Sequence, residues 1–170
     1  MANLIRQQNL IDSNKRALLK YVIISDGTQS ANTVLVDASM LRFALNANGY
    51  IMTSNTHPKS NYKITVKRVF GSASLGSGAS LKLQWQGDSN SEIVTIGTGS
   101  FDYSFDSVGD NAVIPNPEAN ATGDILISTK YLTANDVATF FIDLRKNSED
   151  YDAGQTADPA SFNKGKWSLT

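Results

Sequence analysis

The chain has 170 residues, among them 15 Lys plus Arg, 16 Asp plus Glu and no Cys, which gives a net charge of −1. This length predicts a single domain with a sizeable core, and the lack of cysteine excludes disulfides and thiolate metal sites. The near-neutral charge excludes a field strong enough to collect nucleic acid or an anionic membrane, so neither is an expected partner.

The N-terminal residues 1–14 (MANLIRQQNLIDSN) are rich in Asn and Gln and show no clear apolar period. We interpret them as an arm that lies outside the core. Charged residues in this region also argue against a signal peptide or a membrane span. The folded domain is therefore expected to occupy residues 15–146.

The first predicted strand covers residues 16–25 (RALLKYVIIS), where both alternating sets of side chains are largely apolar. This pattern predicts a strand that is buried on both faces. A short β-branched strand follows at residues 33–36. Asp37 then stands where a helix N-cap would, so a short helix is predicted at about 38–47, with a strand as the alternative for the same residues.

From Tyr62 onward the chain alternates apolar and polar residues in short runs separated by Gly, Ser, Asn and Asp. Each run predicts a strand with one buried and one solvated face. Strands about ten residues apart, with turn signals between them, are typical of sandwiches rather than of βαβ units. We therefore predict an all-β protein, an antiparallel β-sandwich that is jelly-roll-like. The predicted strands of this part are 62–70, 79–86, 93–96, 101–105, 113–114, 124–129 and 137–144.

Residues 147–170 lose this pattern and are interpreted as a polar C-terminal arm. Both arms lack the periodic apolar residues that would offset ordering entropy, so we expect them to be mobile in the isolated protein and ordered on a partner. Isolated apolar residues in such arms are the expected anchors of an interface. These residues are Leu4, Ile5, Tyr151 and Trp167.

Few residues have catalytic or metal-binding potential. His57, the only histidine, precedes a proline in a polar loop without partners for a proton relay, so we interpret it as a solvated loop residue. Asp88, Asn90 and Glu92 place oxygen atoms at alternate positions, as calcium loops do, but the central glycine and distant glutamate of such loops are missing. A polar turn is the preferred interpretation, and no enzyme activity, metal or cofactor is expected.

An aromatic stripe lies between two acidic residues, Asp102 and Asp106. Their spacing places both carboxylates on the solvated side of one strand, which does not favour a catalytic pair. The aromatic side chains could form a sugar-stacking platform, but each shares a face with other apolar residues, which favours burial in the core. The aromatic residues considered are Trp85, Phe101, Tyr103 and Phe105.

Short motifs are spaced along the chain between residues 34 and 146. They are 34–39 (VLVDAS), 63–68 (KITVKR), 81–85 (LKLQW), 99–103 (GSFDY), 123–127 (GDILI) and 144–146 (LRK). In these motifs the chain resembles a family of small virion structural proteins of tailed bacteriophages, particularly marine and cyanobacterial ones, of the head decoration or cement type. The motifs are structural and carry no catalytic signature, and the polar segment 151–170 departs from the family pattern.

The resemblance implies a surface component of the virion that is made in the host cytoplasm. Among such roles we favour a capsid decoration or cement protein, which binds the outer surface of the major capsid lattice and stabilises the head through many copies. The expected partners are the major capsid protein or other virion structural proteins, and self-association is a further expectation. A neck or tail adaptor is the alternative within the virion, and a carbohydrate-binding module is the alternative outside it.

Overall fold

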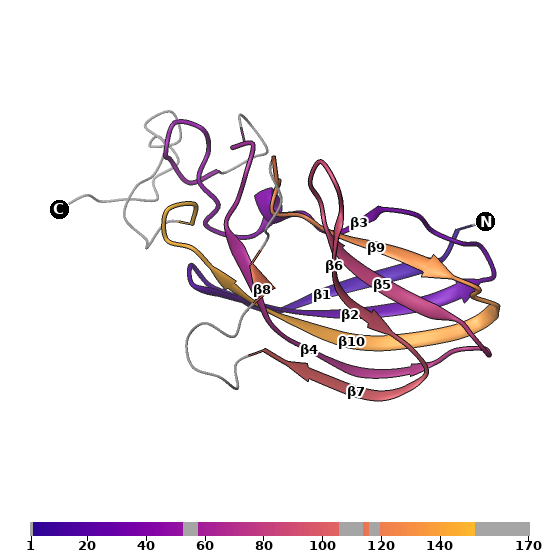
Figure 1. Ribbon diagram of the computed structural model, residues 1–170. Coiled ribbons are helices and arrows are strands. Elements are labelled where there is room, and N and C mark those ends of the chain that lie inside the picture. The colour runs from indigo at the N-terminus through magenta and orange to yellow at the C-terminus, as the bar shows by residue number, and fades with distance from the viewer. Residues whose placement is uncertain (1, 53–57, 106–113, 116–119, 152–170) are drawn as a thin grey trace.

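The computed structural model describes residues 2–52, 58–105, 114–115 and 120–151. These residues form two antiparallel sheets that lie face to face (Figure 1), which confirms the prediction of an all-β antiparallel sandwich. Sheet A contains, in spatial order, β1 (Leu4–Asp12), β2 (Arg16–Asp26), β10 (Ala134–Lys146), β4 (Ile64–Ser74) and β7 (Gly99–Ser104), with β8 (Ile114–Pro115) paired to β4. Sheet B contains β3 (Thr33–Val36), β9 (Ile125–Lys130), β5 (Ser80–Trp85) and β6 (Ser91–Ile96).

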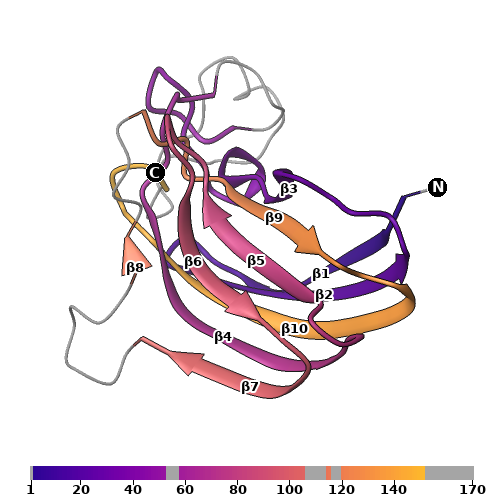
Figure 2. The same cartoon turned by 45° about the vertical axis from the view of Figure 1, so that its right-hand side comes forward.

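The strand pairing shows that the chain folds back on itself like one long hairpin. Strands β2, β3, β4 and β5 pair antiparallel with β10, β9, β7 and β6 respectively. Successive pairs alternate between the two sheets, so the long hairpin is rolled into a sandwich, and Figure 2 shows sheet B lying across sheet A. This arrangement places β1 and β7 at the edges of sheet A, and β3 and β6 at the edges of sheet B.

The core lies between the sheets and follows the period-two pattern of the strands. On β2 the buried residues alternate with more exposed ones. Strands β10 and β5 also bury alternate apolar side chains in this core. Trp85 is fully buried at the end of β5, as predicted. Gly71 on β4 permits a close approach of the β10 backbone, because a Cβ there would lie 2.2 Å from the carbonyl oxygen of Thr139.

The prediction that β2 is buried on both faces is wrong. Leu18 and Val22 on the outer face are only partly buried, and Ile24 is exposed. The reason is that sheet B covers only the inner face of β2, and no described element covers its outer face.

The N-terminal segment is a strand rather than a detached arm. Strand β1 pairs with β2 from Leu4 to Asp12, with a bulge at Leu10. Most of its residues are exposed because it is an edge strand, and only Ile5 packs against the core. The predicted boundary at residue 15 is therefore wrong.

The predicted helix at 38–47 is also wrong, apart from its first turn. Asp37 caps a single 3-10 turn, Ala38–Met40, by accepting a hydrogen bond from the Ser39 backbone N–H. Phe43 then takes a positive φ of 67°, which an α-helix cannot contain. Leu41 and Ala44 are buried, so the apolar spacing reflects a loop that packs onto the core.

The chain after β10 also belongs to the fold as far as Tyr151. The backbone N–H of Tyr151 donates to the carbonyl oxygen of Asn147 at 3.0 Å, and Tyr151 forms an isolated bridge with Ala44. Residues 147–151 are therefore not an arm, and residues 152–170 of the predicted arm lie outside the described residues.

Candidate functional site

The residues first considered for chemistry either hydrogen-bond to neighbouring side chains or lie outside the described residues. His57 and Asp106 are among the latter. The side chains of Asp88, Asn90 and Glu92 hydrogen-bond to three different neighbours, namely Asn120, Asn32 and Thr95. Within the described part of the chain, no group of three or more His, Cys, Asp or Glu side chains could hold a metal ion.

The aromatic stripe on β7 is only partly buried. Phe101 and Phe105 pack against the core, but Tyr103 is 37% exposed, so the prediction of a buried position is wrong for Tyr103. The reason is that β7 is the edge strand of sheet A, where the core layer ends.

The three predicted anchors that the structure describes do not form one surface. Leu4 is exposed on β1, whereas Ile5 faces the core. Tyr151 is fully buried, and its hydroxyl donates a 2.8 Å hydrogen bond to the carbonyl oxygen of Ala38, so it is not accessible to a partner. Trp167 lies outside the described residues.

A candidate surface lies on the outer face of sheet A, by which we mean the side of β1, β2, β10 and β4 that is turned away from sheet B. The strand register aligns Leu4, Ile24 and Val137 across three neighbouring strands. Their side chains are 44%, 40% and 37% exposed, respectively. Large apolar side chains side by side on an open sheet face are typical of interaction surfaces.

Stacked aromatic rings continue this surface on β4 and β10. Phe70 and Phe141 are paired across the strands, with ring centroids 4.9 Å apart and planes 9° apart. The Arg68 guanidinium lies 4.3 Å from the Phe70 ring centroid, a cation–π contact. These contacts place two aromatic rings and a guanidinium group together on the outer face.

Two bidentate ion pairs border the aromatic pair. Arg16 binds Asp143 with two bonds of 2.8 Å, and Arg68 binds Asp102 with bonds of 2.9 and 2.6 Å. The hydrogen bonds from Arg68 lower the pKa of Asp102 below its ordinary value. Such exposed pairs add little to the free energy of unfolding, but they fix the orientation of the charged groups that a partner would meet.

A buried polar cluster lies where the end of β1 meets the end of β10. The Lys146 ammonium group donates to the Asp12 carboxylate and to the carbonyl oxygens of Ser13 and Arg42. Asp12 also accepts a 3.1 Å hydrogen bond from the Arg42 backbone N–H. Burial lowers the pKa of Lys146. The cluster therefore ties the end of β1 to β10 and to the loop after β3.

Three buried or half-buried tyrosines predict the behaviour of the protein at alkaline pH. Burial raises the pKa of Tyr21, Tyr62 and Tyr151. A phenol with a raised pKa stabilises the fold fully below its unfolded pKa of about 10 and loses this effect as pH rises further. Lys146 has a lowered pKa, so its deprotonation raises the free energy of unfolding as pH rises. This contribution ends near pH 10.4, about the ordinary pKa of lysine, and does not offset the tyrosines at higher pH.

We therefore expect the free energy of unfolding to fall above about pH 10, by up to about 1.4 kcal/mol per pH unit for each phenol. Urea unfolding between pH 8 and about 11.5 measures this slope. The Tyr21→Phe variant should show a shallower slope than the native chain, because one titrating group is gone. A slope that is unchanged in this variant would contradict burial of the Tyr21 hydroxyl.

Comparisons with models of protein families, with curated proteins and with solved structures found no match. Among the described residues, no helix is long and apolar enough to cross a membrane. The candidate surface therefore rests on the geometry of the chain itself. The sequence did not predict the outer face, because its residues come from strands that are far apart in the chain. One signal was present: Arg68 and Phe70 are two positions apart and therefore lie on the same face of one strand.

Proposed function

We propose that the protein is a virion structural protein of a tailed bacteriophage, and specifically a capsid decoration protein that binds the outer surface of the major capsid lattice. The resemblance noted in the sequence is one support. The observation that carries the proposal is the exposed outer face of sheet A, where neighbouring strands present a row of apolar side chains, a stacked aromatic pair and fixed ion pairs on the same side of the sheet.

The strand order also supports this proposal. Eight of the strands follow the order expected of a jelly roll, with β2, β10, β4 and β7 in sheet A and β3, β9, β5 and β6 in sheet B, while β1 and β8 are additions to sheet A. Jelly rolls occur in viral capsid domains and in lectins. Their two packed sheets leave outer faces free, which suits a protein that adds to an existing lattice.

The mode of binding differs from the arm-based mode that the sequence suggested. Residues Leu4 to Asp12 are committed to sheet A, and Tyr151 is committed to the core. Binding through the outer face needs no ordering of a flexible segment, so it avoids the entropy cost that an arm would carry. A protein present in many copies then stabilises the head by mass action, even if each contact is modest.

A carbohydrate-binding module is the second candidate, and one observation favours it. Tyr103 is exposed at the edge of sheet A, with its ring centroid 5.9 Å from that of Phe101. An exposed ring of this kind can stack on a sugar. A glycan array tests this candidate, and binding that is lost in the Tyr103→Ala variant would support it.

The decoration role is tested by the copy number of the protein in purified particles. Quantitative mass spectrometry should find it in a fixed ratio to the major capsid protein, with many copies per head. A few copies per particle would instead indicate the neck or tail adaptor. Absence from the particle would overturn the proposal.

A further inference from the structure

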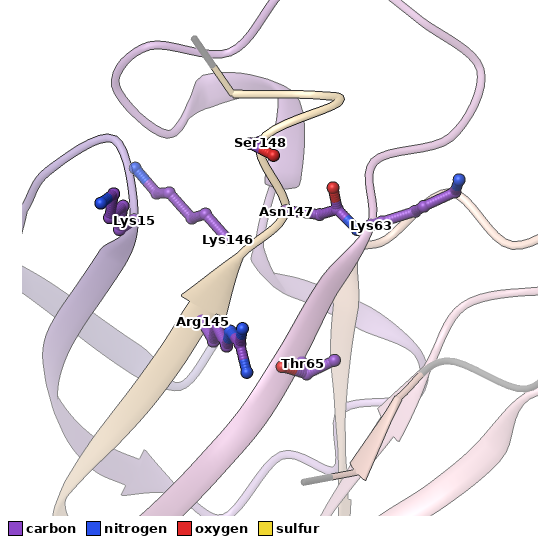
Figure 3. A pocket seen from close by; sticks show the side chains of 7 residues that line it. All are labelled: Lys15, Lys63, Thr65, Arg145, Lys146, Asn147 and Ser148. Atoms are coloured by element: carbon purple, nitrogen blue, oxygen red, sulfur yellow. The ribbon is translucent and has the colours of Figure 1, made fainter. Parts of the chain in front are cut away.

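A basic hollow of about 460 Å³ lies at one end of sheet A (Figure 3). We use this name for the space between the end of β10 and the starts of β2 and β4. Four of the seven residues that line it are basic, namely Lys15, Lys63, Arg145 and Lys146, and none of these seven described residues is acidic. The side chain of Lys146 is itself buried, so the charge exposed to the hollow comes from the other three. The protein as a whole has a net charge of −1, so this concentration of positive charge is local.

The strand register explains why the cations meet there. The backbone N–H of Lys146 donates to the Lys15 carbonyl oxygen at 2.9 Å, and that of Asn147 donates to the Lys63 carbonyl oxygen at 3.0 Å. Arg145 pairs with Thr65 on β4 in the same ladder. Three strands therefore deliver basic residues to one end of the sheet.

Internal acidic residues compensate only two of these cations. The Lys146 ammonium is held by Asp12 and is buried, and Lys63 forms a 2.6 Å ion pair with Glu149. Lys15 and Arg145 are exposed and have no ion pair within the described residues. Two basic groups therefore remain available to an incoming anion.

A buried hydroxyl group in the lining also lacks a partner. Thr65 Oγ1 has no hydrogen-bond partner in the described part of the chain. Figure 3 shows the Thr65 oxygen turned toward Arg145. A buried hydroxyl without a partner is unfavourable. An acceptor oxygen that displaces the groups covering Thr65 Oγ1 would satisfy the hydroxyl and pair with the neighbouring Arg145 guanidinium.

We propose that the basic hollow binds the carboxylate groups of an acidic peptide segment on a neighbouring protein. The identification of the neighbouring protein as a virion subunit rests on the proposed function. The expectation that the hollow binds carboxylate groups rests on the residues of the hollow alone. Its volume is in the range of about 300–1,000 Å³ typical of ligand sites and is too large for one inorganic anion to fill. A short segment with more than one carboxylate matches both the volume and the separate positions of Lys15 and Arg145.

The test uses the full chain and a capped hexapeptide of alternating Glu and Gly, titrated by NMR at low ionic strength. The peptide should shift the amide signals of the hollow, and binding should weaken as salt is added. Arg145→Gln and Lys15→Gln should each weaken binding by about tenfold, the loss expected for one charge-assisted hydrogen bond. Lys130→Gln, on β9 of sheet B, is the matched control and should bind as the native chain does.

The Thr65→Val variant separates binding from folding. Valine has nearly the same shape and lacks the unpartnered hydroxyl, so the melting temperature should stay the same or rise while peptide affinity falls. Affinity that stays unchanged in the Thr65→Val and Arg145→Gln variants would overturn the proposal. So would inorganic phosphate that binds as tightly as the peptide, because the ligand would then be a single anion.

The result also separates this proposal from the proposed function. Native protein that binds particles but does not bind the peptide would overturn the assignment of the hollow and leave the decoration role standing. Native protein that binds the peptide at the hollow but is absent from particles would support the site chemistry and overturn the decoration role.

Discussion

Replacing Trp85 with alanine is expected to lower the free energy of unfolding by about 3 to 5 kcal/mol, the usual cost of truncating a large buried aromatic side chain. Trp85 is fully buried at the end of β5 and lies on the same strand as the buried Leu81 and Leu83. Truncation would leave a cavity between the two sheets. Urea unfolding of the native and variant proteins measures the difference.

Trp85→Phe is the matched variant for this prediction. The indole N–H of Trp85 has no hydrogen-bond partner in the described residues, so phenylalanine loses packing but no hydrogen bond. We expect a cost of less than half that of the alanine variant, because much of the apolar volume remains. An alanine variant as stable as the native chain would contradict the position of Trp85 in the core.

Replacing Lys146 with methionine is expected to destabilise the protein by a similar amount, about 3 to 5 kcal/mol, because it leaves a buried carboxylate without its cation. The side chains of Lys146 and Asp12 are 0% and 5% exposed. The same substitution also leaves the carbonyl oxygens of Ser13 and Arg42 without their donor. Thermal and urea unfolding measure the loss.

The double variant Asp12→Asn with Lys146→Met is the control. It removes both charges, so it should recover part of the stability lost in the single variant. If the Lys146→Met variant instead had the same urea midpoint of unfolding as the native chain, the ion pair would not be buried. The close attachment of β1 to the domain would then be contradicted.

The sandwich could be predicted because its central strands have one buried and one solvated face. Alternation in β4, β5 and β10 reports this directly in the sequence. The burial of Trp85 followed from the same pattern, since it shares a face with Leu81 and Leu83.

The edges of the structure could not be predicted in the same way. Strand β1 is exposed along most of its length, so it needs no apolar alternation, and its Asn and Gln residues gave no sign of pairing with β2. The loop at 38–47 has helix-like apolar spacing because separate residues pack onto the core. The spacing of apolar residues alone does not distinguish an amphipathic helix from a loop whose separate residues pack onto the core.

The candidate surface depended on strand register, which the sequence does not encode locally. Phe70 and Phe141 stack across β4 and β10, and Arg16 meets Asp143 across β2 and β10. The members of each pair are far apart in the chain. Their residue types were visible, but their contact was not.

The most direct test of the proposed assembly surface is the binding of surface variants to particles that lack the native protein. Ile24→Lys places a charge on the outer face of sheet A, and Val34→Lys is a matched control on β3 of sheet B, with Ile24 and Val34 40% and 50% exposed. Both variants should retain the native melting temperature. We predict that occupancy of the particle falls strongly for Ile24→Lys and stays at the native level for Val34→Lys. Full occupancy with Ile24→Lys, or loss confined to Val34→Lys, would contradict binding through the outer face of sheet A.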